Sequence, residues 1–112
     1  MRSILVIISS SQNTQNAARA LKLASTLNEQ GNKVSVFLLQ DGTYCAHSKQ
    51  SQEAKAAIDK ALAEGIDIYV MEEDVIARGF RGEDLIPKIR ASDYPELVDL
   101  MMERHDLVMG TF

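Results

Sequence analysis

The feature that most constrains the fold is the alternation of short apolar runs with longer segments of helical periodicity. Three runs, Ile4–Ile8, Val34–Leu39 and Ile66–Met71, are largely apolar and rich in β-branched residues. Runs of this kind are typical of strands that are covered on both faces. Strands that alternate with helices indicate a parallel sheet with a helical layer on each side.

The segments between these runs repeat small and apolar residues at spacings of three and four. The first predicted helix begins at Thr14 and stops before Gly31, and the second spans Ser51–Glu64 and stops before Gly65. Both glycines are suited to the left-handed conformation that commonly ends a helix.

The C-terminal third is less regular, because Gly79, Gly82 and Pro87 interrupt any long helix. Its predicted elements are a helical turn near Asp74–Arg78, a brief strand around Lys88–Ala91, a helix from about Pro95 to His105, and a closing strand in DLVMGTF. Leu97, Val98, Met101 and Met102 form one apolar stripe on that helix, in which the two methionines are predicted to belong to the core or to a subunit contact.

The whole chain, residues 1–112, is therefore predicted to be one α/β domain. We expect a three-layer α/β/α sandwich with a mainly parallel sheet of about five strands. The formal charge of −4 argues against a protein that grips nucleic acid through its phosphates. One cysteine excludes an internal disulfide, and no apolar run is long enough for a signal-peptide core or a membrane span. We therefore expect a cytoplasmic protein without membrane contact.

Three loops that follow the predicted strands carry the polar residues of interest. They read SSSQNT (Ser9–Thr14), QDGTYC (Gln40–Cys45) and EEDVIARG (Glu72–Gly79). Loops that follow parallel strands converge at the carboxyl edge of the sheet, where ligands and chemistry gather. We therefore expect Cys45, the serine cluster and the acids of Glu72–Asp74 to lie along one edge.

Three motifs, LLQDGTYCA, MEEDVIARGF and SDYPELVDL, follow one another in this chain. Together they resemble the DsrE/DsrF/DsrH superfamily of sulfur-relay proteins, and the C-terminal half is most similar to the DsrH/TusB branch. The matching residues are Asp41, Gly42, Tyr44 and Ala46 in the first motif, Glu73, Asp74, Ala77, Arg78 and Gly79 in the second, and Asp93, Tyr94, Val98 and Leu100 in the third.

The resemblance implies a small flavodoxin-related α/β subunit that associates with itself or with other DsrE/DsrF/DsrH-like subunits. It also implies a link to persulfide transfer, either toward transfer-RNA thiolation or in sulfur oxidation. Asp41, Gly42, Tyr44, Asp74, Arg78 and Gly79 are the family-motif residues that we expect to matter for such an interface. Sulfur carriers of the superfamily have a cysteine after the third strand or in the first helix, and this chain has none at either place.

Cys45 is the candidate catalytic residue, because persulfide transfer requires a thiolate. If Asp41 caps a helix that begins at Gly42, Cys45 lies near the positive end of that helix. Against this, a free cysteine usually packs as a small buried apolar residue, and nearby acids disfavour a thiolate. His47 cannot serve as its base, since residues two apart on a helix do not face each other. We favour the packing interpretation.

Other polar residues have both a functional and a structural interpretation. Ser9, Ser10, Ser11 and Thr14 resemble an anion-binding loop, but the loop lacks a glycine, and we favour a plain capping loop. Glu72–Asp74 would offer oxygen ligands, yet consecutive acids seldom converge on one cation, so no metal site is predicted. Arg78 would bind an anion or pair with Asp74, four residues earlier.

The sequence shows no paired acid and base, no nucleophile triad and no phosphate-binding P-loop, so we expect neither a cofactor nor independent catalysis. The leading hypothesis is a structural or docking subunit of a sulfur-relay assembly, whose partners are other subunits and a sulfur donor or acceptor protein. The alternatives are a sulfur carrier that uses Cys45, and a flavodoxin-like module that binds an anion or nucleotide.

Overall fold

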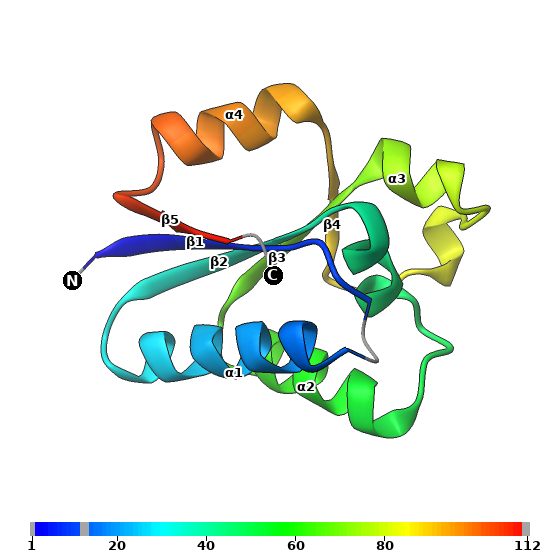
Figure 1. The fold of residues 1–112 in the computed structure, drawn as a ribbon, viewed down its shortest axis with the longest axis horizontal. Helices are drawn as coiled ribbons and strands as arrows, with labels where there is room; N and C mark the ends of the chain where they lie inside the picture. Colours follow the sequence, from blue (N-terminus) through cyan, green and yellow to red (C-terminus); the bar gives the residue numbers. More distant parts are fainter. Residues whose placement is uncertain (1, 12–13, 111–112) are drawn as a thin grey trace.

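The computed structural model describes residues 2–11 and 14–110, which form a twisted sheet between two helical layers (Figure 1). Every pair of neighbouring strands is parallel, and the strand order is β4-β3-β2-β1-β5. The strands are β1 (Ser3–Ile8), β2 (Lys33–Leu38), β3 (Asp67–Met71), β4 (Arg90–Ser92) and β5 (Leu107–Met109). The predicted five-stranded parallel sheet is confirmed.

The helices cover the two faces of the sheet unequally. Two long helices, α1 (Gln15–Glu29) and α2 (Gln52–Ala63), lie on one face, and α4 (Tyr94–Met102) lies alone on the other (Figure 1). Two shorter segments, α3 (Glu72–Ala77) and the 3₁₀ helix η2 (Gly82–Asp84), lie beyond the end of β3. The molecule is therefore the predicted three-layer sandwich.

Alternate residues of the central strands form two separate cores. In register across the sheet, Val6 pairs with Val36 and Val36 with Ile68, and these three side chains pack toward α1 and α2. The neighbouring residues Phe37 and Tyr69 point to the other face, under α4. Because both faces of β1–β3 are buried, these strands need continuous apolar runs, which is the pattern seen in the sequence.

Side-chain caps define where three of the helices begin. Thr14 accepts a hydrogen bond from the Ala17 amide, Ser51 from that of Ala54, and Asp93 from that of Glu96. Gly31 and Gly65 have φ angles of +94° and +86°, so both adopt the left-handed conformation predicted at the helix ends. The helices predicted from Thr14 and over Ser51–Glu64 are thus confirmed within a residue or two.

Boundaries in the C-terminal third differ from the prediction. The helical turn predicted near Asp74–Arg78 begins earlier, at Glu72, and ends at Ala77. The fourth strand begins at Arg90 rather than Lys88, because Lys88 has a φ of +79°, which is incompatible with a strand. Helix α4 ends at Met102, before His105, whose ring instead contacts the Leu100 carbonyl (Nδ1 to O, 2.9 Å). That contact satisfies one of the carbonyl groups left free at the helix end.

The prediction that one apolar stripe of α4 is buried is wrong in part. Leu97 and Leu100 are buried against the sheet, whereas Val98, Met101 and Met102 are exposed. Successive helical residues turn by about 100°, so Leu97 and Val98 cannot both face a sheet that the helix touches along one side only. Met101 and Met102 are therefore not core residues. The other role predicted for them, a subunit contact, stays a prediction. Among the described helices, none has both the length and the apolar character to cross a membrane.

Candidate functional site

The loops after β1, β2 and β3 meet at the carboxyl edge of the sheet. The thiol of Cys45 lies 3.8 Å from the carbonyl oxygen of Ser10, which links the second loop to the first. The Gln40 amide donates to Oδ2 of Asp74 over 2.6 Å, which links the second loop to the third. The predicted convergence of these three loops is confirmed, although Gln12 and Asn13 of the first loop lie outside the described residues.

The loop after β2 turns sharply at two residues. Gln40 has a φ of +52°, and its amide is held by Asp74. A Cβ atom at Gly42 would lie 2.1 Å from the Ile8 carbonyl oxygen, so only glycine lets this loop pass against the end of β1. The tight approach explains why the motif has a glycine immediately after Asp41.

The segment that follows is a 3₁₀ helix, η1 (Gln40–Ala46), and it corrects one expectation. Its N-cap position is Leu39, which makes no side-chain capping bond, so Asp41 does not cap a helix that begins at Gly42. Cys45 is the last residue but one of η1, at the negative rather than the positive end. The helix-dipole argument for a reactive thiolate is therefore wrong.

Arg78 joins the second and third loops. Its Nη2 lies 3.0 Å from Oδ1 of Asp41, and its Nη1 donates to the Asp74 carbonyl oxygen over 3.3 Å and lies 3.9 Å from Asp74 Oδ1. The sequence predicted only the Asp74 pair, which is the longer one. Arg78 is the C-cap of α3, and Gly79 follows with a φ of +77°, the left-handed turn that ends this helix.

An aromatic cluster covers one side of this ion-pair network. The Arg78 guanidinium carbon lies 6.0 Å from the centre of the Tyr44 ring. Tyr44 packs edge-to-face on Phe80 with ring centres 5.2 Å apart, and His47 packs on the same phenylalanine at 4.6 Å. His47 accepts a hydrogen bond from the Lys49 amide through Nδ1. The ring of His47 thus contacts Phe80 and the Lys49 amide.

We use the name rim network for six residues of the first and second motifs that lie at this edge. They are Asp41, Tyr44, Asp74 and Arg78, which these contacts join, and the adjoining glycines Gly42 and Gly79. Arg78 and Asp74 are mostly buried, with 22% and 18% of their side chains exposed, while Asp41 is 64% exposed. Charge-assisted hydrogen bonds in partly buried surroundings hold side chains in one geometry, so the network presents a rigid polar edge.

Sequence reasoning missed two contacts at this edge of the sheet. It did not pair Arg78 with Asp41, although opposite charges at the ends of neighbouring strands were a usable signal. It also missed the contribution of Phe80, which is the last residue of the second motif and holds both Tyr44 and His47.

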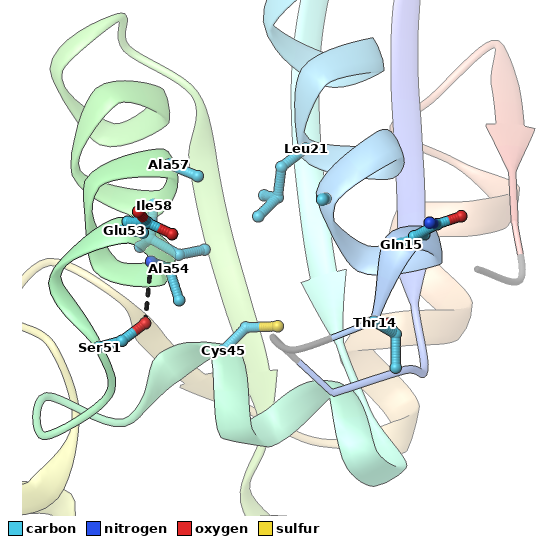
Figure 2. Close-up of a pocket in the computed structure, with 10 residues that line it drawn as sticks. Thr14, Gln15, Leu21, Cys45, Ser51, Glu53, Ala54, Ala57 and Ile58 are labelled. Atoms are coloured by element: carbon cyan, nitrogen blue, oxygen red, sulfur yellow. Dashed lines mark hydrogen bonds between the residues drawn. The ribbon is translucent and has the colours of Figure 1, made fainter.

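Cys45 is fully buried and points into the space between the N-terminal halves of α1 and α2 (Figure 2). It lies at the base of a cleft of about 360 Å³, whose apolar walls include Leu21, Ala54 and Ile58. Burial raises the pKa of the Cys45 thiol from its ordinary value of 9.0 to about 12. At neutral pH the group is therefore held as the protonated thiol.

The remaining candidate residues have defined positions. Thr14 caps α1, and its hydroxyl also donates a hydrogen bond to the Ser11 carbonyl oxygen over 2.8 Å. The Ser10 carbonyl oxygen accepts a hydrogen bond from the Cys45 thiol. These contacts are those of a capping loop, and binding of an anion by Ser9, Ser10, Ser11 and Thr14 stays a prediction. Among the described residues, no group of three or more His, Cys, Asp or Glu side chains is arranged to hold a metal ion.

Comparison with known proteins adds a family match and several related folds. The family model described as "DsrH like protein" matches residues 10–107, a span that contains all three motifs. An uncharacterized protein of Methanocaldococcus jannaschii is 26% identical over 112 residues, which cover 96% of this chain and 98% of that protein.

Solved structures show the same fold at low sequence identity. The ychN protein from E. coli has a TM-score of 0.87 and 18% identity, with 97% of this chain and 98% of that chain covered. A protein of unknown function from Methanobacterium thermoautotrophicum has a TM-score of 0.77 and 14% identity, with 98% and 100% covered. One from Bacteroides thetaiotaomicron has a TM-score of 0.75 and 14% identity, with 96% and 94% covered.

Proposed function

The chain belongs to the DsrH-like family, and from that membership we propose that it is a non-catalytic docking subunit of a sulfur-relay assembly. Membership by itself suggests a sulfur-relay-related protein. In our proposal the rim network faces a thiol-bearing protein, and the assembly serves transfer-RNA 2-thiolation or sulfur oxidation. Its other components are DsrE/DsrF/DsrH-like subunits or further copies of this chain.

The observation that carries the non-catalytic role is the state of Cys45. Transfer of a persulfide begins with attack by a thiolate, and the rate depends on the thiolate fraction and on access. Cys45 is buried, and its pKa is raised to about 12. The sole sulfhydryl group of the chain is thus poorly suited to receive sulfur, and a partner has to supply the reactive thiol.

The rim network supports the docking role. Its charged and aromatic side chains contact one another, through the pairs Arg78–Asp41 and Arg78–Asp74 and through the approach of Arg78 to the Tyr44 ring. A surface that is already ordered loses little conformational freedom when a partner binds. Asp41 remains largely exposed and offers a carboxylate to a cation on that partner.

Persulfide loading tests the non-catalytic role. The protein is incubated with a cysteine desulfurase and cysteine and is then weighed intact, beside Cys45→Ser and Glu72→Cys variants. We expect no added sulfur on the wild type, and one added sulfur on Glu72→Cys, where an exposed thiol follows the third strand. A gain of one sulfur on the wild type that disappears in Cys45→Ser contradicts the proposal.

Complex formation tests the docking role. A cysteine-bearing DsrE-like protein is mixed with the wild type, with Asp41→Lys and with Asp59→Lys, and the mixtures are sized by sedimentation. Asp59 is an exposed acid of α2 outside the rim network, so its reversal gives the same charge change elsewhere on the surface. We expect Asp41→Lys alone to weaken the complex; equal behaviour of the two variants removes the rim network from the interface.

One observation favours a second candidate function, in which Cys45 carries sulfur itself. The thiol, although buried, is among the residues that line the cleft between α1 and α2 (Figure 2). Separation of the N-terminal ends of α1 and α2 would expose it to a partner's persulfide. The mass measurement above decides between the two functions, because only a carrier gains sulfur at Cys45.

A further inference from the structure

Helix α4 carries an exposed apolar stripe that nothing in the chain covers among the described residues. Tyr94, Val98 and Met102 follow one another at four-residue spacing, and Met101 lies beside them. Val98 is 56% exposed and Met102 is 74% exposed. These side chains point away from the sheet, against which Leu97 and Leu100 pack. Contiguous exposed apolar surface of this kind marks an interaction site more often than free surface.

The stripe is bordered by acidic residues. From Asp93 to Asp106 the chain holds five carboxylates and one arginine, a formal charge of −4 that equals the charge of the whole protein. Arg104 is already engaged, with Nε 2.8 Å from Asp99 Oδ2 and Nη2 3.4 Å from Glu96 Oε2. Asp99 and Glu103 are exposed and, at 100° per residue, follow the stripe around one side of the helix.

We propose that this surface, which we call the α4 face (Tyr94, Val98, Met101 and Met102 with the acidic border Asp99 and Glu103), docks a different protein that presents an apolar patch bordered by lysine or arginine. The apolar side chains supply the buried contact, and the acidic border selects a basic partner and speeds its approach. This inference rests on the proposed function, because it names the chemistry of one partner in the assembly.

The charge of the border argues against an antiparallel pairing of two copies of this chain through α4. When two identical helices pack antiparallel across a two-fold axis, equal flanks face each other. Asp99 and Glu103 of one copy would then lie beside the same residues of the other, and like charges across a contact oppose association. A partner with a basic border removes that repulsion and adds attraction.

A charge-reversed copy of the protein provides a probe of known composition. Asp99→Lys with Glu103→Lys keeps the apolar stripe and gives it a basic border. By sedimentation at 50 mM salt, we expect the wild type and the reversed copy, each alone, to keep the size of the corresponding protein that carries Val98→Ser with Met102→Ser. We expect their mixture to form a larger assembly that contains the two copies in equal amounts. Raising the salt to 500 mM is expected to weaken this pair about tenfold, because screening shortens the reach of the charges.

Two controls separate the α4 face from general charge attraction. Glu53→Lys with Asp59→Lys makes the same change on exposed positions of α2, on the opposite side of the sheet, and this copy is expected not to pair with the wild type. Val98→Ser with Met102→Ser in the wild type is expected to abolish pairing with the reversed copy. If the double reversal fails to fold, Glu103→Lys alone, at an exposed residue, replaces it and is expected to pair more weakly.

The outcomes are distinct. Absence of pairing at both salt concentrations overturns the proposal, and so does pairing that the α2 control reproduces. Self-association of the wild type that strengthens in high salt and is lost in Val98→Ser with Met102→Ser makes the α4 face a contact between identical copies instead. Failure of the proposed function is measured separately, by persulfide loading and by the Asp41→Lys complex, because neither experiment alters the α4 face.

Discussion

Arg78 Nη2 lies 3.0 Å from Asp41 Oδ1, although the two residues are 37 positions apart in the chain. This ion pair joins the loop after β2 to the helix after β3, and it unites the first and second family motifs at one edge of the sheet. The arginine also contacts the Asp74 backbone and the Tyr44 ring, so a single guanidinium organises the rim network.

Arg78→Ala should lower the free energy of unfolding by about 1–3 kcal/mol. The change leaves Asp74 partly buried without its cation, and removal of one member of such a pair costs more than the pair itself contributes. Urea unfolding at pH 7 measures the effect. Arg81→Ala is the matched control, because both side chains of the Arg81–Glu83 pair are exposed. Loss of this pair should change the free energy of unfolding by no more than about 0.5 kcal/mol. Equal losses in the two variants would show that the rim network has no special stability.

Gly42→Ala should be among the most destabilising single changes in the chain, at about 3 kcal/mol or more. Its new methyl group would lie 2.1 Å from the Ile8 carbonyl oxygen, so either β1 or the turn has to move. The matched control is Gly82→Ala, which meets nothing within 4 Å. Thermal or urea unfolding should separate the two variants clearly. A Gly42→Ala protein as stable as the control would mean that the loop does not pass so close to β1.

Gln40→Gly should stabilise the protein, by about 0.5–1 kcal/mol. Gln40 is exposed and has a φ of +52°, a conformation that costs a residue with a Cβ atom and costs glycine little. Gln40→Ala removes the same side chain but keeps the Cβ atom, and should give no gain. The measurement is the urea midpoint at constant slope; a loss of stability in Gln40→Gly would mean that the side chain contributes more than the backbone strain.

Stability should fall at high pH through Cys45. The folded protein holds this thiol protonated to about pH 12, whereas an unfolded chain ionises it near 9.0. The stabilisation is therefore complete below pH 9 and is lost as the pH rises from 9 toward 12. Between pH 7 and pH 10, the wild type should lose about 1 kcal/mol more than Cys45→Ala, which lacks the group.

The comparison with Cys45→Ala is needed because lysines and tyrosines titrate in the same range and affect both proteins alike. Urea unfolding at the two pH values gives the difference. Parallel losses in wild type and variant would show that the folded protein exposes the thiol, and would favour the sulfur-carrier alternative.

Much of the architecture follows from local patterns along the chain. The β-branched runs of β1 and β2, the capping residues Thr14 and Ser51, and the stop at Gly31 are all decided by the period of side-chain burial and by backbone preferences of neighbouring residues. Parallel topology then places the three loops at one edge. For this reason the fold class and the convergence of the loops could be predicted without coordinates.

The tertiary structure decided what the residues at that edge do. Local preference suggested a capped helix after Asp41, but the close passage of Gly42 against Ile8 and the bond from Gln40 to Asp74 select a 3₁₀ helix instead. The partner of Arg78, the burial of Cys45 and the outward face of Val98 and Met102 depend on residues distant in sequence. Side-chain periodicity reports which positions prefer to be buried, whereas contacts and pKa shifts depend on which distant groups the packed sheet brings within a few ångströms.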